Sequence, residues 1–292
     1  SFHPSGGSAL LALRHLGLAF GSLLAAAVIG VGSLGNLAGA APLAWVVEAV
    51  GWRATLWALA GITLLVALAI LTFTRDPERV TRPEGVAHGS VLDILKLPAI
   101  WLILPLTLVN YTSAAGIRGL WAGPWLTAIH GADAALIGRV TLIMGMAMVA
   151  GNFAYGPADR IFGSHKRVAL LGNAVLAAAL AALWLNPGIG LWGATALLAV
   201  VGFFGASFAV LMAHGRAFFP PHLVGRGVTL LNMFSITGVA LASFGSRPVF
   251  EAASRAGDPT HAYGVLFLFF LLPLLIGLVI YLFARDKPGA AG

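Results

Sequence analysis

The sequence predicts an all-α fold, a polytopic bundle of about eight or nine membrane-spanning helices, and three observations lead to it. Hydrophobic residues make up 59% of the 292 residues and charged residues only 9%, with a mean hydropathy of +0.94, whereas soluble domains carry about 25% charged residues. The apolar runs are continuous, which excludes the alternating pattern of barrel strands. The 37 glycines suit closely packed membrane helices. A lipid bilayer is therefore the expected surrounding of most of the chain.

A membrane-spanning helix needs about 20 mainly apolar residues. Successive segments of this kind lie at 54–74, 98–128, 134–157, 168–187, 190–213, 226–249 and 263–284. A further apolar run covers residues 9–50 and is interrupted early by Arg14 and His15. As one helix this run would extend ~63 Å at 1.5 Å per residue, about twice the hydrocarbon thickness. It therefore holds two spans, or one span with a short leading piece.

The basic residues are unevenly distributed between the two sides of the predicted bundle. Of the 17 lysines and arginines, the loops on one side hold only Arg53, Arg139, Arg247 and Arg255. Arg14 and Arg118 lie within apolar runs, and all the others lie on the opposite side, which includes the longest polar segment, 75–97. Loops rich in Lys and Arg stay in the cytoplasm, so that side is expected to be cytoplasmic. Within the polar segment, residues 91–95 fit a short amphipathic helix on the membrane surface.

Several classes of function are excluded by what the sequence lacks. It has no cysteine and no nucleophile-elbow, zinc-protease or phosphate-loop motif. The net charge of +7 comes from basic residues scattered at span ends, which is ordinary topology signal, so no nucleic-acid partner is expected. The candidate acids lie near span ends or in loops: Glu48, Asp93, Asp133, Glu251 and Asp258. We therefore expect no enzyme activity, no metal and no cofactor.

Four segments resemble the major facilitator superfamily of secondary transporters. Tyr155-Gly-Pro-Ala-Asp-Arg-Ile-Phe-Gly-Ser-His-Lys-Arg167 resembles its inner-loop motif G-x-x-x-D-R-x-G-R-[KR], with Tyr155 in place of the leading Gly and one additional residue before Gly163. Residues 35–53, with a Gly-Trp-Arg turn, resemble the fifth helix, the outer turn and the start of the sixth. Residues 119–126 resemble the outer end of the seventh helix, and residues 218–227 the inner loop before the eleventh.

This resemblance implies a domain organisation and a function. Residues 1–74 would be the last two or three spans of an N-terminal half, 75–97 the cytoplasmic central loop and 98–292 a complete C-terminal six-helix half. The missing N-terminal helices would then be a partner. The implied function is alternating-access transport of a small-molecule substrate such as an organic anion or drug-like molecule. The resemblance further implies coupling to an ion gradient, with the proton as the expected ion, and location in a bacterial inner membrane. The rival readings are a membrane scaffold or receptor without transport activity, and an intramembrane enzyme.

Family members bind substrate between their halves, with the seventh and tenth helices lining the cavity. Here those helices would be 98–128 and 190–213, so the resemblance gives as substrate-binding candidates Tyr111, Arg118, Trp121, Trp125, Ser207 and His214. Helical spacing places Tyr111, Arg118 and Trp125 on one face, because seven residues make about two turns. Arg118 would bind an anion or act in gating, or alternatively extend to the membrane surface as an anchor.

Two further groups of residues have alternative interpretations. His214 would serve proton coupling or be a solvated residue at the inner end of its span. Asn110, Asn152 and Asn232 are expected to form hydrogen bonds between helices. The remaining group is a candidate gating cluster of charged residues. These residues would change partners between two conformations, or alternatively would only supply the positive charge of an inner loop. They are Asp159, Arg160, Lys166, Arg167 and Arg226.

Overall fold

The computed structural model describes residues 41–73 and 90–286, and every regular element in this part of the chain is helical. The helices are α2 (Ala41–Val50), α3 (Trp52–Phe73), α4 (Val91–Leu95), α5 (Pro98–Gly116), η1 (Ile117–Trp121), α6 (Ala122–His130), α7 (Ala134–Phe162), α8 (His165–Leu185), α9 (Leu191–Gly205), α10 (Phe208–Arg216), η2 (Pro221–Leu223), α11 (Val224–Ser254) and α12 (Pro259–Tyr281). The predicted all-α fold is therefore confirmed.

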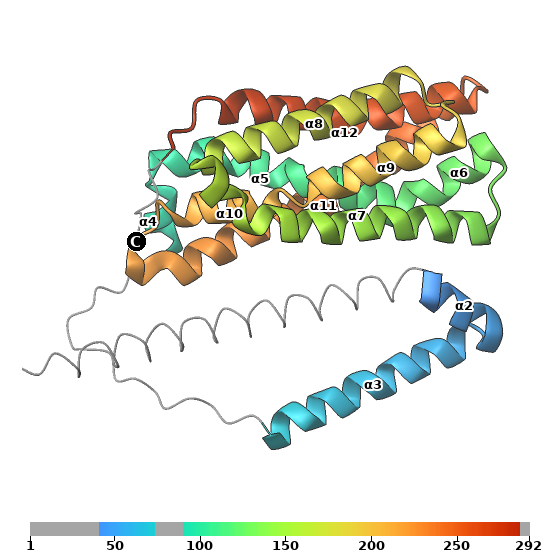
Figure 1. Cartoon of the computed structure of the whole chain (residues 1–292), viewed down its shortest axis with the longest axis horizontal. Helices are drawn as coiled ribbons and strands as arrows, with labels where there is room; N and C mark the ends of the chain where they lie inside the picture. Colours follow the sequence, from blue (N-terminus) through green and yellow to red (C-terminus); the bar gives the residue numbers. More distant parts are fainter. Residues whose placement is uncertain (1–40, 74–89, 287–292) are drawn as a thin grey trace, which may run out of the picture.

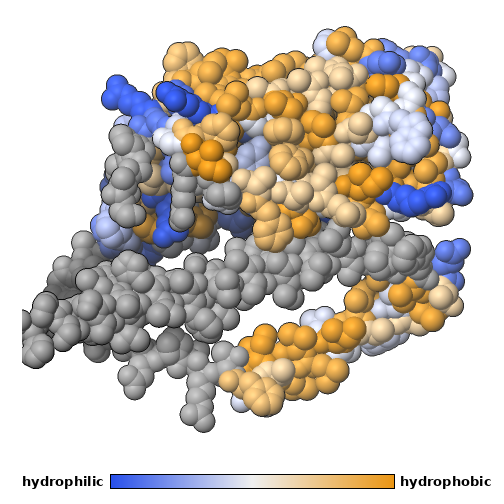
Figure 2. Space-filling view, viewed as in Figure 1, coloured by the Kyte–Doolittle hydropathy of each residue, from blue (hydrophilic) through white to orange (hydrophobic). Residues whose placement is uncertain are grey.

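Seven helical stretches within the described residues are long and apolar enough to cross a membrane, and each coincides with a predicted span after residue 50. Two of them are composite, since α5, η1 and α6 follow one another as Pro98–His130, and α9 and α10 as Leu191–Arg216. Figure 2 shows hydrophobic residues over the middle of the visible face and hydrophilic residues towards both ends. The chain is thus a multi-pass membrane protein. The run 9–50, in which one or two spans are predicted, lies mostly outside the described residues, and its described part, 41–50, forms α2.

The six spans from α5 onward form one bundle (Figure 1). In it α7 packs against α9, α11 against α5, and α12 against both α5 and α8. The large side chains of its interior include Trp125, Phe267 and Tyr281, each almost completely buried. The α3 helix differs, because Thr55 is its one buried residue. Helix α2 contacts α7.

Local sequence signals define where these helices begin and end. The side chain of Asp133 accepts a hydrogen bond from the backbone N–H of Leu136 at 2.8 Å, and Ser164 caps α8 in the same way. Asp258 accepts from the N–H of Thr260 at the start of α12. These caps satisfy backbone donors that the first helical turn leaves unpaired. The predicted helix at 91–95 forms α4, whose capping box joins Ser90 and Asp93.

Glycines allow a close helix crossing between α7 and α9. A Cβ atom on Gly202 would overlap the carbonyl oxygen of Met144, and one on Gly151 would overlap the carbonyl oxygen of Phe203. The two backbones therefore touch where each helix offers a glycine to the other. This is the close approach that small residues permit in membrane proteins.

The orientation of the bundle can be tested at the two ends of α11, because the sequence contains no native cysteine. Gly225 and Ser254 are both exposed. We expect Gly225→Cys to react with a membrane-impermeant maleimide from the cytoplasmic side and Ser254→Cys from the outside, as the distribution of Lys and Arg predicts. Labelling intact cells and inverted vesicles measures this. The reverse pattern would overturn the orientation. Gly163 and Gly257 are less suitable positions because both have positive φ angles.

Candidate functional site

A groove of about 630 Å³ lies between the composite span α5–η1–α6 and helix α7. Its polar side chains are Tyr111, Arg118 and Thr141, and the rest of its lining is apolar and mostly small, as at Ala115 and Gly138. We call it the Tyr111–Arg118 groove. Among residues 41–73 and 90–286, its ionisable lining side chains are one guanidinium and one phenol. An apolar recess with a few convergent polar groups is the usual form of a small-molecule site.

The guanidinium of Arg118 lies near the middle of the hydrocarbon core, as its neighbour on α7 indicates. A Cβ atom on Gly145 of α7 would be 3.3 Å from Nη2 of Arg118, so the charged group rests beside that glycine. Gly145 is three turns into α7, about 17 Å from its start at Ala134. The hydrocarbon core is about 30 Å thick, which places the group near its middle. The alternative in which Arg118 extends to the membrane surface does not fit this position.

Tyr111 lines the groove two turns before Arg118, as the seven-residue spacing predicts. Its ring packs against Phe208, at the start of α10, with 5.2 Å between the ring centroids. The segment 190–213 therefore contacts Tyr111 through Phe208, a residue that the sequence reasoning did not single out.

Trp125 does not share the face of Tyr111 and Arg118. It is completely buried, donates from Nε1 to the carbonyl oxygen of Pro187 at 3.1 Å, and packs edge-on against Phe267. The reason is the π-helical turn at Ile117–Trp121, closed by a bond from the N–H of Ala122 to the carbonyl of Ile117. An i→i+5 turn holds one additional residue, which turns the later residues by about 100° relative to an uninterrupted α-helix. Gly123 lines the groove instead.

Trp121 is half-buried and is likewise engaged in packing between helices. Its Nε1 donates to Oγ of Ser246 on α11 at 2.9 Å, and its ring lies 4.8 Å from that of Phe250. These contacts join η1 to α11 rather than to the groove.

Ser207 belongs to a polar cluster in the bundle interior with Asn110 and Asn173, all three completely buried. The amide nitrogen of Asn173 donates to the carbonyl of Ala169 at 2.8 Å, which fixes the orientation of that amide. Its oxygen then accepts from Nδ2 of Asn110 at 2.6 Å, and the same Nδ2 lies 2.9 Å from Oγ of Ser207. The predicted interhelical role is thus confirmed for Asn110, which joins α5 to α8 and to the α9–α10 junction. Asn152 is half-buried and Asn232 exposed.

His214 lies at the opposite end of the bundle from the α6–α7 turn and is completely buried, so it is not the solvated residue of the alternative interpretation. Its Nε2 faces the carbonyl oxygen of Arg285 at 3.1 Å. A carbonyl only accepts hydrogen bonds, so Nε2 carries the proton, and Nδ1 accepts from the hydroxyl of Tyr281 at 2.6 Å. Oδ1 of Asp286 lies 3.8 Å from Nε2, and the His165 ring stacks on the imidazole. The sequence reasoning missed Tyr281 and Asp286.

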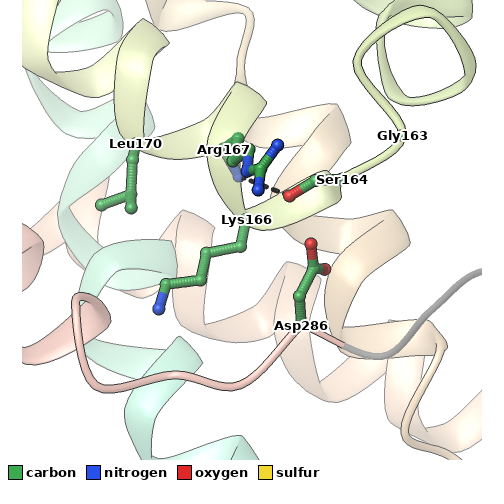
Figure 3. Close-up of a pocket in the computed structure, with 6 residues that line it drawn as sticks. All are labelled: Gly163, Ser164, Lys166, Arg167, Leu170 and Asp286. Carbon is green, nitrogen blue, oxygen red and sulfur yellow. Dashed lines mark hydrogen bonds between the residues drawn. The ribbon is translucent and has the colours of Figure 1, made fainter.

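The gating candidates are only partly brought together. Lys166 and Arg167 line a pocket of about 400 Å³ with Asp286 (Figure 3). Nζ of Lys166 donates to the carbonyl of Leu282 at 2.8 Å, which ties the start of α8 to the residues after α12. Arg226 is exposed in the first turn of α11 and does not line this pocket. Asp159 and Arg160 belong to α7, but their side chains lie outside the described part of the structure.

No protein-family model matches the sequence, and no curated protein is similar enough to it to count as a relative.

Proposed function

We propose that this protein is a secondary transporter that binds a small organic anion in the Tyr111–Arg118 groove and moves it by alternating access. The observation that carries the proposal is the guanidinium of Arg118 beside Gly145, near the middle of the membrane, on the surface of a groove whose other described lining is mostly apolar. An ionisable side chain at that depth is expensive and usually marks a substrate or ion pathway.

The groove chemistry favours an anion with an apolar body. A guanidinium offers a carboxylate two parallel hydrogen bonds as well as a charge. Tyr111 adds a hydroxyl two turns away, while Ala115, Gly123 and Gly138 leave apolar space around the ligand. A ligand with a carboxylate at one end and a compact hydrocarbon at the other matches this arrangement.

The resemblance to the major facilitator superfamily supports transport rather than a scaffold or an enzyme. On this proposal N-terminal helices are a partner of the bundle, and the protein resides in a bacterial inner membrane. The coupling ion is a proton, with His214 as its acceptor, since a second proton would enter at Nδ1 and the resulting cation would have Asp286 3.8 Å away. His titrates near neutral pH more readily than any other side chain.

Binding of matched probes to the purified chain in lipid nanodiscs tests the proposal. Benzoate, benzamide and benzylamine share one ring and differ in charge. We expect benzoate to bind about ten- to a hundredfold more tightly than benzamide, because a charge-assisted contact contributes about 1.5–3 kcal/mol. Benzylamine should bind most weakly. Isothermal titration calorimetry gives the three constants. Equal affinities, or tighter binding of benzylamine, would contradict an anion site.

A further inference from the structure

We infer that Gly145 is a positioning residue whose missing side chain forms the seat that holds the Arg118 guanidinium in the groove. The inference rests on the proposed function, because it concerns how the binding group of that site is held. Its basis is the position of Gly145 on the groove-lining face of α7.

The guanidinium lies face-on against the backbone of Gly145. A Cβ atom built there would be 3.3 Å from Nη2, 3.5 Å from Cζ and 3.6 Å from Nε of Arg118. Because three atoms of the planar guanidinium lie at nearly equal distances from that Cβ position, the flat face of the group is turned towards Gly145. The N–H bonds of a guanidinium lie in its plane. Stacking on the glycine therefore directs those donors sideways along the groove surface rather than into α7.

Gly145 occupies the centre of the face that α7 presents to the groove. Gly138, Thr141 and Met148 line the groove, and they are seven and four residues before Gly145 and three after it, so all four share one side of the helix. Gly145 itself is buried. Arg118 covers it, so the guanidinium forms the groove surface where a side chain of α7 would otherwise stand.

Gly145 differs from Gly151 and Gly202, the two buried glycines at which α7 and α9 cross. A Cβ on Gly151 or Gly202 would overlap a backbone carbonyl oxygen of the facing helix. At Gly145 the three nearest atoms all belong to the Arg118 side chain. The absence of a Cβ at this position therefore makes room for one functional side chain.

Graded substitutions at Gly145 test the inference with benzoate as the probe in nanodiscs. Gly145→Ala requires a displacement of a few tenths of an ångström and should weaken binding severalfold, although Ala is the better helix former. Gly145→Val fills the seat and should approach the ten- to hundredfold loss expected for removing the charge-assisted contact. Gly156→Ala and Gly156→Val are matched controls on the same helix, where a Cβ meets no atom within 4 Å.

A double-mutant cycle with Arg118→Gln separates positioning from folding. If Gly145 acts through Arg118, Gly145→Val should have no further effect on benzoate binding in the Arg118→Gln background. An equal loss in both backgrounds would overturn the inference, as would normal binding by Gly145→Val where Arg118→Gln alone weakens it. If Arg118→Gln binds benzoate normally, the proposed function itself fails. Should Gly145→Val not fold, the same cycle with Gly145→Ala decides the matter.

Discussion

Arg118→Gln is expected to weaken benzoate binding by about ten- to a hundredfold, the largest effect we predict for one side chain in the groove. The substitution removes the positive charge and the planar pair of donors but keeps a side chain of related length. A charge-assisted hydrogen bond contributes about 1.5–3 kcal/mol, which corresponds to this range of affinity. Titration calorimetry on folded protein in nanodiscs measures the change, and the melting temperature should stay nearly constant.

Two further variants show whether the effect depends on guanidinium geometry. Arg118→Lys keeps the charge without the planar donors and should recover only part of the affinity. Arg139→Gln removes an exposed arginine on α7 that does not line the groove, and it should bind benzoate normally. An unaltered constant for Arg118→Gln would remove Arg118 from the binding site and with it the support for an anionic substrate.

Gly202→Val is expected to prevent formation of a stable bundle. A Cβ on Gly202 overlaps the carbonyl oxygen of Met144, and a backbone oxygen cannot move aside as a flexible side chain can. Overpacking a core costs about 1–3 kcal/mol even where side chains can adjust, and here α7 and α9 must separate. Fluorescence-detected size-exclusion chromatography in detergent should show little monodisperse protein.

The matched control for this prediction is Gly156→Val, which adds the same side chain on α7 where a Cβ meets no atom within 4 Å. It should elute as the unsubstituted chain does. Monodisperse Gly202→Val with an unchanged melting temperature would show that α7 and α9 do not cross as closely as described.

The sequence alone was sufficient for the spans because lipid requires about 20 apolar residues wherever a helix crosses it. It was also sufficient for Asn110, since a buried amide in a membrane needs a partner. It was not sufficient for Trp125. Helical spacing assumes 3.6 residues per turn throughout, and no feature of Ile117-Arg-Gly-Leu-Trp121 marked the π turn that changes the register.

The surroundings of His214 were hidden from the sequence for a different reason. Its partners come from the end of the described chain: the hydroxyl of Tyr281, the carbonyl of Arg285 and the carboxylate of Asp286. A backbone carbonyl carries no residue-specific signal, and Asp286 is flanked by Arg285 and Lys287 like an ordinary charged tail. Only the folded arrangement brings that tail back to α10.

The π turn in η1 affects how the Pro98–His130 span tolerates changes in chain length. Because the turn holds one residue more than an α-helical turn, deleting Gly119 would leave the residues for an uninterrupted α-helix. The helix would remain continuous, and because the deletion removes the residue that the turn accommodates, the later side chains would keep their present direction. Trp121 would still face Ser246, and Trp125 would still face the carbonyl of Pro187. The same deletion outside the turn would rotate all later side chains by about 100°, so the span should tolerate the loss of one residue at η1 better than elsewhere.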